Sequence, residues 1–437
     1  MMDATARAIG TVAAPRRRLG LLRQWPWLVA LVVAILVPWV FYDWAHHRQS
    51  GFVLSMLSQM GMMVIFALSY NMLMGQAGLL SFGHAVFFGL GGYVAAHVLN
   101  DKAALVPVEL IPLVAGLGGL VFAIVFGYMA TRQRATAFAM ITLGIGELVT
   151  VAAMMFHAFF GGEGGITTDR MIDNSLLGLT YAHGIEVYYL IIGWTVISTL
   201  AMAFLTGTPL GRMANACRDN HERAQFMGYD PKTVRFLQFA LSGLFAGIGG
   251  GLFALTYEIV TFDAVAAPLS ANALLMAYIG GSTVFAGPIL GAVLITLLQS
   301  GLSLLSNAWL VYVGVLFIAM VMFAPAGLAG VVLAHRPIAR TGRLGRLAVP
   351  YLRLVLPGAA TIFGVIAMVE LLSFLTIGAA QGKTLQLLGT KIDVNAAQPW
   401  IVAVVCLVGG GAWLRFEGRA FHRVWETLTA DIKGDPA

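Results

Sequence analysis

The sequence predicts an all-α polytopic membrane protein, and two observations support this prediction. Of the 437 residues, 59% are hydrophobic and 11% are charged, whereas a soluble domain carries roughly 25% charged residues. The apolar residues also gather in runs of the length that a membrane-spanning helix needs, about 20 residues. A soluble core could not bury this much apolar surface, so the solvent of this chain must be lipid.

Twelve apolar segments are candidate membrane spans. We expect the first ten to form a transmembrane core within residues 25–334. The last two belong to a C-terminal extension, residues 335–437, which begins with a basic linker. In order, the candidate spans are 25–44, 52–74, 78–99, 105–130, 136–160, 187–206, 233–257, 269–285, 287–306, 308–325, 352–378 and 399–414.

The distribution of lysine and arginine predicts the orientation of these spans, because cytoplasmic loops carry an excess of both residues. With residues 1–24 as a cytoplasmic tail, both termini and the loop 207–232 lie in the cytoplasm, and the loop 161–186 lies outside. A signal peptide would also begin with basic residues and an apolar run. However, no small-residue cleavage site follows, which favours an uncleaved first span. All but five of the 26 basic residues then lie on the cytoplasmic side, the exceptions being Arg48, Lys102, Arg170, Lys383 and Lys391.

The first of three glycine-rich stretches covers residues 71–93. Its glycines permit close approach of helices, or a break in a helix whose backbone lines a cavity. Polar side chains at membrane depth usually face a pathway or a neighbouring helix. Both interpretations are open for the polar residues of this stretch, Asn71, Gln76, Ser81 and His84.

The second and third glycine-rich stretches predict close helix packing and a tight connection. Glycines of the second recur every four residues, so they lie on one helix face and favour the close approach of a neighbour. Glycines of the third interrupt the apolar pattern, which predicts a tight connection between two spans. The residues are Gly243, Gly247 and Gly251 in the second stretch and Gly280, Gly281 and Gly287 in the third.

Signals of catalysis are weak, so we expect no catalytic site, cofactor or metal in this chain. Residues 378–384 resemble a P-loop, but the spacing is one residue short and no strand precedes it. Glu147 and Glu370 lie inside apolar spans, where a paired carboxyl group is favoured over a proton-transfer site. Cys217 and Cys406 are too few for a zinc site or a disulfide framework. The net charge of +6 follows from the orientation of the spans and does not indicate a nucleic-acid partner.

The loop between the sixth and seventh spans holds the densest cluster of charge in the middle of the sequence. Helix-forming residues flanked by Gly-Thr-Pro and Asp-Pro predict a short helix over 211–228. Charge alone leaves two interpretations open, a merely solvated helix or a surface on which another protein docks.

Four motifs resemble those of branched-chain amino acid ABC importer permeases. The segment GRMANACRDNHERAQFMG, residues 211–228, resembles the coupling segment of that family. The first and third glycine-rich stretches resemble its early and third signatures, and FAPAGLAG, residues 323–330, resembles its closing one. The long N-terminus and the position of the outer loop, residues 161–186, are similar to those of the M-type subunit of that family. Two departures stand out, which are Ala326 where a basic residue is usual and the extension beyond the usual core.

The resemblance implies a subunit of a larger importer in the bacterial inner membrane. Its partners would be a second, homologous permease, two cytoplasmic ABC ATPase subunits that use the ATP, and a periplasmic substrate-binding protein. The coupling residues that it implies are Arg212, Arg218, Glu222, Ala224 and Gly228. The resemblance also implies a substrate pathway, lined by the polar residues of the first glycine-rich stretch and by two phenylalanines. These residues are Asn71, Gln76, Ser81, His84, Phe87 and Phe88.

Alternative functions remain open at this point. Amide and urea importers share the glycine-rich signatures, so the substrate class has a second candidate. An ion-coupled secondary transporter would use Glu147 or broken glycine-rich helices near the membrane midplane. A membrane enzyme or a channel has less support, because neither a catalytic arrangement nor a filter motif is visible.

Overall fold

The computed structural model describes most of the chain, and the predicted tail 1–24 lies outside the described residues. Part of the P-loop-like segment, residues 379–383, lies outside them as well. The chain divides into two compact units, Met1–Leu54 and Ser55–Ala437. The described residues are 25–40, 42–43, 48–101, 105–133, 135–172, 174–343, 345–378, 384–387, 390–394 and 396–434.

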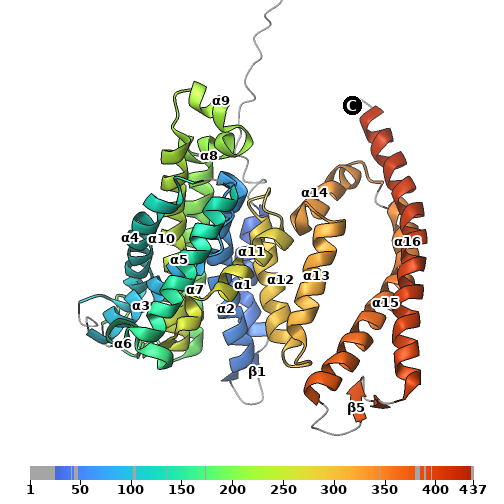
Figure 1. Cartoon of the computed structure of the whole chain (residues 1–437), viewed down its shortest axis with the longest axis horizontal. Helices are drawn as coiled ribbons and strands as arrows, with labels where there is room; N and C mark the ends of the chain where they lie inside the picture. The colour runs from blue at the N-terminus through green and yellow to red at the C-terminus, as the bar shows by residue number, and fades with distance from the viewer. Residues whose placement is uncertain are drawn as a thin grey trace, which may run out of the picture. The chain divides into compact units, whose positions relative to one another are not determined.

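Helices make up most of the described structure (Figure 1). In chain order, the α-helices are α1 (Trp25–Val40), α2 (Gly51–Asn71), α3 (Ala85–Asp101), α4 (Ile111–Ala130), α5 (Ala135–Met155), α6 (His157–Phe160), α7 (Gly184–Gly207), α8 (Pro209–Asp219), α9 (His221–Phe226), α10 (Pro231–Tyr257), α11 (Ala267–Gly280), α12 (Gly287–Leu302), α13 (Trp309–Phe323), α14 (Gly327–Arg340), α15 (Gly345–Ser373) and α16 (Ala397–Gly434). π-Helical turns extend α2 over Met72–Gln76 and α15 over Phe374–Gly378.

The strands are short and form three antiparallel pairs among the described residues. The pairs are β1 (Tyr42–Asp43) with β2 (Arg48–Gln49), β3 (Ile166–Thr167) with β4 (Ile259–Val260), and β5 (Thr384–Leu387) with β6 (Thr390–Asp393). In the first unit, the pair of β1 and β2 follows α1.

The prediction of an all-α polytopic membrane protein is confirmed, although the number of full spans differs. In the described residues, eight helices are long and apolar enough to cross a membrane, or nine if α13 and α14, bent by 43°, form one span. Each of the twelve predicted segments contains an apolar helix. However, four of these helices, α1, α3, α12 and α13, have only 16, 17, 16 and 15 residues, fewer than the roughly 20 that cross a bilayer.

The predicted span 78–99 is helical only from Ala85 onward. Backbone amides at this break bond to side chains of other helices. The amide of Phe82 donates to Thr142 Oγ1 at 3.2 Å, and that of Ala85 donates to Ser270 Oγ at 2.8 Å. Irregular backbone at membrane depth is tolerated where protein surrounds it and its polar groups find partners, which explains why the helix starts late.

Helix α10 lies in the core of the second unit, where it packs against α3 and α4. Asp230 caps its N-terminus, accepting hydrogen bonds from the amides of Lys232 at 3.1 Å and Thr233 at 3.2 Å. Pro231 occupies the first helical position, where its missing amide hydrogen costs nothing. The helix ends at Glu258, whose backbone is left-handed with φ +54°. Its 27 residues extend about 40 Å, enough to cross a membrane.

The glycine face of α10 meets α4 at very short range. A methyl group on Gly243 would lie 2.3 Å from Ala123 Cβ, and one on Gly251 would lie 2.5 Å from Ala115 Cβ. A methyl group on Gly247 would lie 2.6 Å from the Ala115 carbonyl oxygen. Side chains at these positions would push the two helices apart, so this packing depends on the glycines.

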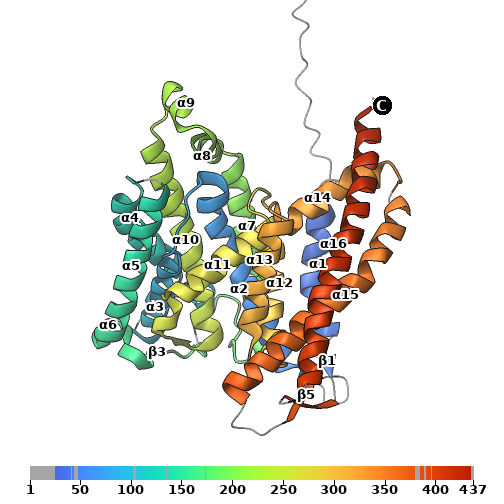
Figure 2. The same cartoon turned by 45° about the vertical axis from the view of Figure 1, so that its right-hand side comes forward.

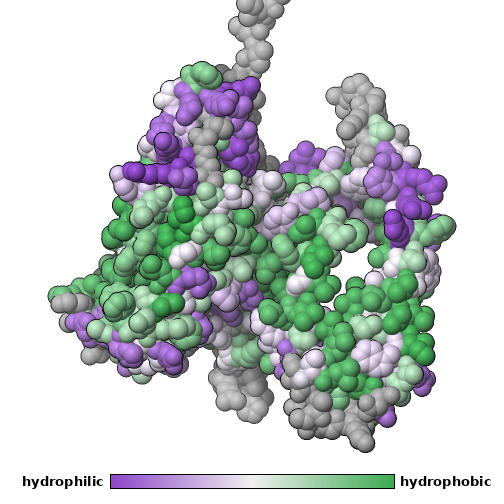
Figure 3. Space-filling view, in the orientation of Figure 1, coloured by the Kyte–Doolittle hydropathy of each residue, from purple (hydrophilic) through white to green (hydrophobic). Residues whose placement is uncertain are grey.

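The polar ends of the second unit lie on either side of an apolar band. Helices α8 and α9 and the C-terminal end of α16 lie toward one end, and α6, β3 and β5 toward the other (Figures 1 and 2). Figure 3 shows hydrophobic residues over the middle of this face and hydrophilic ones toward both ends. This distribution is the one expected for a chain that spans a bilayer.

Candidate functional site

Helices α8 and α9 form the polar segment in the middle of the chain. Thr208 caps α8, because its Oγ1 accepts from the amide of Gly211 at 3.4 Å. The sequence predicts one helix over 211–228, whereas the structure has two. The break lies at Asn220, whose backbone is extended (φ −157°, ψ 102°) and whose Oδ1 accepts from the amide of Arg223 at 3.0 Å. Asn220 thus ends one helix and caps the next.

Arg218, near the end of α8, contacts the first glycine-rich stretch. Its Nη1 donates a hydrogen bond to the backbone carbonyl of Gly75, and its Nε donates to Asp219 Oδ1 at 3.0 Å. A methyl group on Gly78, which has φ +68°, would lie 2.7 Å from Cγ of Arg218. The Gly75 carbonyl belongs to a π-helical turn, where the regular hydrogen-bond ladder is interrupted. It is therefore available to a donor from another segment.

Gly75 itself is surrounded at close range. A methyl group there would lie 2.3 Å from Asn71 Oδ1 and 2.4 Å from the carbonyl oxygen of Ser282. The next residue, Gln76, accepts through Oε1 from Gln238 Nε2 at 3.3 Å. The first glycine-rich stretch is thus joined to α8, to α10 and to the third glycine-rich stretch, which contains Ser282.

The third glycine-rich stretch also contacts the closing motif. Gly281 and Gly327 have φ +104° and +69°, a conformation that favours glycine. A methyl group on Gly281 would lie 2.5 Å from the Ala326 carbonyl oxygen, and one on Gly327 would lie 2.4 Å from the Gly281 nitrogen. Within the stretch, a methyl group on Gly280 would lie 2.0 Å from the Gly287 carbonyl oxygen. All four sequence motifs are therefore linked in one continuous set of contacts.

The other predicted coupling residues occupy different environments. Arg212 donates from Nε and Nη2 to the Gly207 carbonyl at 3.1 and 2.9 Å, at the C-terminal end of α7 where a cation is favourable. Glu222 is exposed and Ala224 is buried. Gly228 has φ +86° with open space around it. Glycine is needed at position 228 because of the turn that follows α9, and not because other atoms of this chain pack closely against it.

An exposed apolar group at the tip of this segment was missed by the sequence analysis. Phe226 is 91% exposed, Met227 59% and Tyr229 42%. Large apolar side chains exposed on a polar segment commonly mark protein–protein contacts. The sequence does contain a signal, because three large apolar side chains occur within four positions of a predicted cytoplasmic loop. The many charged residues around them drew attention away from these side chains. We call Phe226, Met227 and Tyr229 the apolar tip.

The residues predicted to line a substrate pathway are buried inside this chain. His84 shows the arrangement most clearly, with Nε2 2.9 Å from Ser69 Oγ and its ring stacked on Phe66 at 5.4 Å. The Ser69 hydroxyl donates to the Phe66 carbonyl at 2.7 Å, so it accepts from a protonated Nε2 of His84. None of the six exposes more than 7% of its surface, and they are Asn71, Gln76, Ser81, His84, Phe87 and Phe88.

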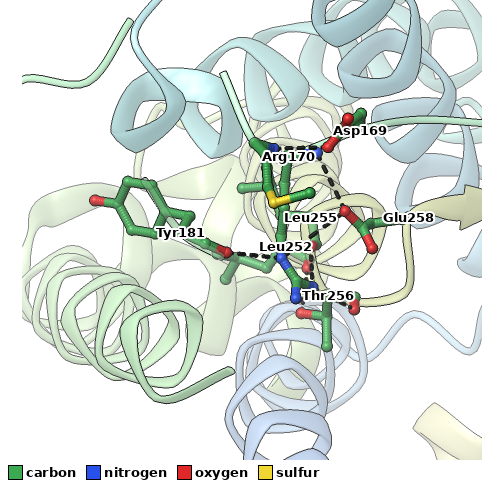
Figure 4. A network of polar contacts seen from close by, with 8 residues as sticks. Asp169, Arg170, Tyr181, Leu252, Leu255, Thr256 and Glu258 are labelled. Atoms are coloured by element: carbon green, nitrogen blue, oxygen red, sulfur yellow. Dashed lines mark hydrogen bonds and ion pairs between the residues drawn. The ribbon is translucent and has the colours of Figure 1, made fainter. Parts of the chain in front are cut away.

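At the opposite end of α10, Arg170 ties the loop 161–186, which we call the outer loop after its predicted side, to the helix (Figure 4). Its Nε donates to the Tyr181 carbonyl at 2.9 Å and its Nη1 to the Thr256 carbonyl at 3.2 Å. Its backbone amide donates to Glu258 Oε1 at 3.2 Å. Because the last carbonyls of a helix carry partial negative charge, a guanidinium group there is favourable. The pairing of β3 with β4 reinforces this connection.

A second anchor of the outer loop is Glu109. Its Oε1 accepts from Ser175 Oγ at 2.7 Å and from the Tyr181 hydroxyl at 2.9 Å, and its Oε2 accepts from the Leu176 amide at 3.1 Å. Burial, together with the bond to this carboxylate, raises the pKa of the Tyr181 phenol. Ser175, Leu176 and Tyr181 of the loop are thus held against Glu109. Within the described residues, no group of three or more His, Cys, Asp or Glu side chains could hold a metal ion.

Residues 52–325 match the family model described as branched-chain amino acid transport system / permease component. The chain belongs to this family. The match includes the apolar tip, the Arg218–Gly75 contact and both anchors of the outer loop, and it ends before α14. Helices α14 to α16 therefore lie outside the part that defines this permease family.

Several curated proteins are similar to this permease chain. The high-affinity branched-chain amino acid transport system permease protein LivM of Escherichia coli (strain K12) is 26% identical, over 61% of this chain and 67% of that protein. BraD, the corresponding protein of Pseudomonas aeruginosa, is 22% identical over 61% of this chain and 91% of its own length. The ribose import permease protein RbsC of Haemophilus influenzae is 26% identical over 58% of this chain and 77% of that protein. No solved structure matches this chain significantly.

Proposed function

We propose that this chain is a transmembrane permease subunit of an ABC importer that translocates branched-chain amino acids. A periplasmic binding protein delivers the substrate, a second homologous permease completes the pathway, and two cytoplasmic ATPase subunits hydrolyse the ATP. The chain itself carries no cofactor and catalyses no reaction. It lies in the bacterial inner membrane with both termini in the cytoplasm, and this orientation is supported by the lysine and arginine distribution.

The observation that carries this proposal is the hydrogen bond from Arg218 to the Gly75 carbonyl. It joins a polar segment outside the apolar band to a glycine-rich break in a membrane helix. A displacement of α8 would therefore act directly on Gly75, and through Gln76 and Gln238 on α10. A coupling segment needs such a connection, because it transmits a movement in water to helices in lipid.

The apolar tip and Glu222 provide the surface for the ATPase in this proposal. Phe226 would fill an apolar pocket of the partner, with Glu222 as a polar contact at the rim. Arg212 contributes by holding α8 against the end of α7. Arg218 contributes by transmitting movement to Gly75.

Branched-chain amino acids as the substrates are supported by the similarity to LivM and BraD, which are both high-affinity branched-chain amino acid transport system permease proteins. RbsC, which is similar over a comparable share of the chain, indicates that the same architecture serves other substrates. A pathway between two permeases would be lined by residues exposed on the single chain. The six buried residues of the first glycine-rich stretch would then shape that pathway from behind, by holding the broken helix in place.

Reconstitution of the complete transporter tests this function. Affinity-tagged chain should co-purify with two ATPases and a second permease, and proteoliposomes should accumulate labelled leucine only with ATP and the binding protein. Excess unlabelled isoleucine or valine should compete, whereas ribose and urea should not. Uptake by this chain alone, driven by an imposed ion gradient, would overturn the proposal.

A further inference from the structure

The C-terminal extension carries three stripes of arginine, one on each of its helices. Helix α14, the start of α15 and the C-terminal end of α16 lie toward the same end of the second unit as α8 and α9 (Figures 1 and 2). Helix residues that are three, four or seven positions apart lie on one face. The arginines on each of the three helices follow this spacing, and all seven are exposed. They are Arg336 and Arg340 on α14, Arg346 and Arg353 on α15, and Arg415, Arg419 and Arg423 on α16.

The three helices meet at this end through an aromatic cluster. The ring of His335 lies 4.8 Å from that of Trp425, and the ring of Tyr351 lies 4.9 Å from that of Phe421. His335 Nε2 lies 2.5 Å from the Tyr351 hydroxyl. Tyrosine and tryptophan are enriched where membrane meets water, because each combines an apolar ring with a polar group. The cluster therefore places this end of the extension at the membrane surface.

The charge of the arginine stripes is not neutralised by the protein. Within the described part of the chain, no hydrogen bond or ion pair involves any of the seven side chains. Arginines four positions apart repel one another on a helix, as Arg415, Arg419 and Arg423 do. Glu426, one of the few acidic groups nearby, already interacts with His422 at 3.2 Å. An external anion would remove this repulsion.

We propose that the arginine stripes bind the headgroup of an anionic phospholipid. The guanidinium forks match phosphate oxygens in geometry and charge, and basic clusters beside membrane helices attract anionic lipids. Next to Arg353 in the sequence, Leu352, Val355 and Leu356 of α15 expose apolar surface to the lipid chains. This adjoining apolar surface selects a lipid over free phosphate. The site lies outside residues 52–325, which define the permease family.

Native mass spectrometry of the full-length chain tests this proposal. The chain is purified in detergent and mixed with equal amounts of phosphatidylglycerol and phosphatidylcholine, and the retained lipids are counted. Wild-type protein should retain phosphatidylglycerol preferentially. In the triple variant Arg415→Gln, Arg419→Gln and Arg423→Gln the preference should fall, by about fivefold for each arginine that contacts the headgroup. The double variant Arg346→Gln and Arg353→Gln, on a different helix, should show the same direction of change.

A matched control separates a local site from general charge. The variant Arg132→Gln, Arg223→Gln and Lys232→Gln removes three exposed basic side chains outside the extension and should keep the wild-type preference. An equal loss in this control would overturn the proposal, as would the absence of a phosphatidylglycerol preference in the wild type. Arginine-dependent retention of another protein in place of lipid would also overturn it. Displacement of phosphatidylglycerol by free phosphate at millimolar concentration would show that the apolar surface contributes nothing to the selection of a lipid, and it would contradict this part of the proposal.

Discussion

Arg218 and Gly75 lie 143 positions apart in the sequence, and the arginine side chain donates a hydrogen bond to the glycine carbonyl. The contact connects two motifs that the sequence analysis assigned to different tasks, one to coupling and one to the pathway. The first prediction concerns this bond.

Replacement of Arg218 by glutamine should reduce ATP-driven leucine uptake tenfold or more, because a hydrogen bond from a charged group contributes about 1.5–3 kcal/mol and 1.4 kcal/mol is tenfold. ATP hydrolysis by the assembled complex should change much less, since the ATPase sites are in other subunits. Uptake and hydrolysis would be measured in the same proteoliposomes. Arg223→Gln, an exposed arginine one helix further on, is the control. Uptake within twofold of the wild type for Arg218→Gln would contradict the assignment.

Gly247→Ala should destabilise the folded protein, because the new methyl group would meet the backbone of α4 at 2.6 Å. Overpacking of this kind typically costs about 1–3 kcal/mol, visible as a lower midpoint of thermal unfolding in detergent. Gly193→Ala on α7 is the control, since nothing lies within 4 Å of its added methyl group. Equal midpoints for the two variants would refute the close α4–α10 contact.

Phe226→Ala should weaken the binding of the ATPase without lowering the stability of the chain. The side chain is 91% exposed, so its removal leaves no cavity, whereas a central interface aromatic contributes about 2 kcal/mol or more. Pull-down titration would show a dissociation constant raised at least tenfold. Phe323→Ala, also highly exposed but outside this segment, should leave the affinity unchanged. Unaltered ATPase binding by Phe226→Ala would remove the apolar tip from the interface.

His84→Ala should lower thermal stability and leave the KM for leucine unchanged. The imidazole is fully buried among Ser69, Phe66 and Phe87, and emptying such a site costs about 2–5 kcal/mol. Thermal unfolding and concentration-dependent uptake measure the two effects separately. A raised KM at unchanged stability would return His84 to the substrate pathway.

Asp230 predicts a pH dependence at the start of α10. Bonds from Thr233 and the Lys232 amide hold the pKa of the Asp230 carboxyl below its ordinary value. The cap is therefore fully present above the ordinary pKa of about 3.9 and is lost as the pH falls through the lower folded-state value. The protection factors of the Lys232 and Thr233 amides against hydrogen exchange should fall over that range. Asp230→Asn should show no such acid-dependent change, and identical profiles for both proteins would exclude the cap as its origin.

Much of the fold follows from hydropathy and glycine spacing, whereas the contacts among motifs do not. The recurrence of glycine every four residues predicts the face of α10 that carries Gly243, Gly247 and Gly251. This prediction is possible because the pattern lies within one continuous segment of the sequence. The late start of α3 depends on hydrogen bonds to Thr142 and Ser270, which lie on helices far away in the sequence. The polar residues Asn71, Gln76, Ser81 and His84 illustrate the same limit, because polarity marked them as unusual but only the packing shows that they face the protein interior.

The glycine face of α10 also bears on how α10 and α4 can move relative to one another. Ala123 and Ala115 of α4 lie against Gly243 and Gly251, and Ile248 of α10 lies over Gly116 of α4. Both separation and axial sliding would break these close contacts, because densely packed surfaces transmit strain and do not deform continuously. We therefore expect the two helices to move as one body, with the Asp230 cap at one end of α10 and Arg170 at the other.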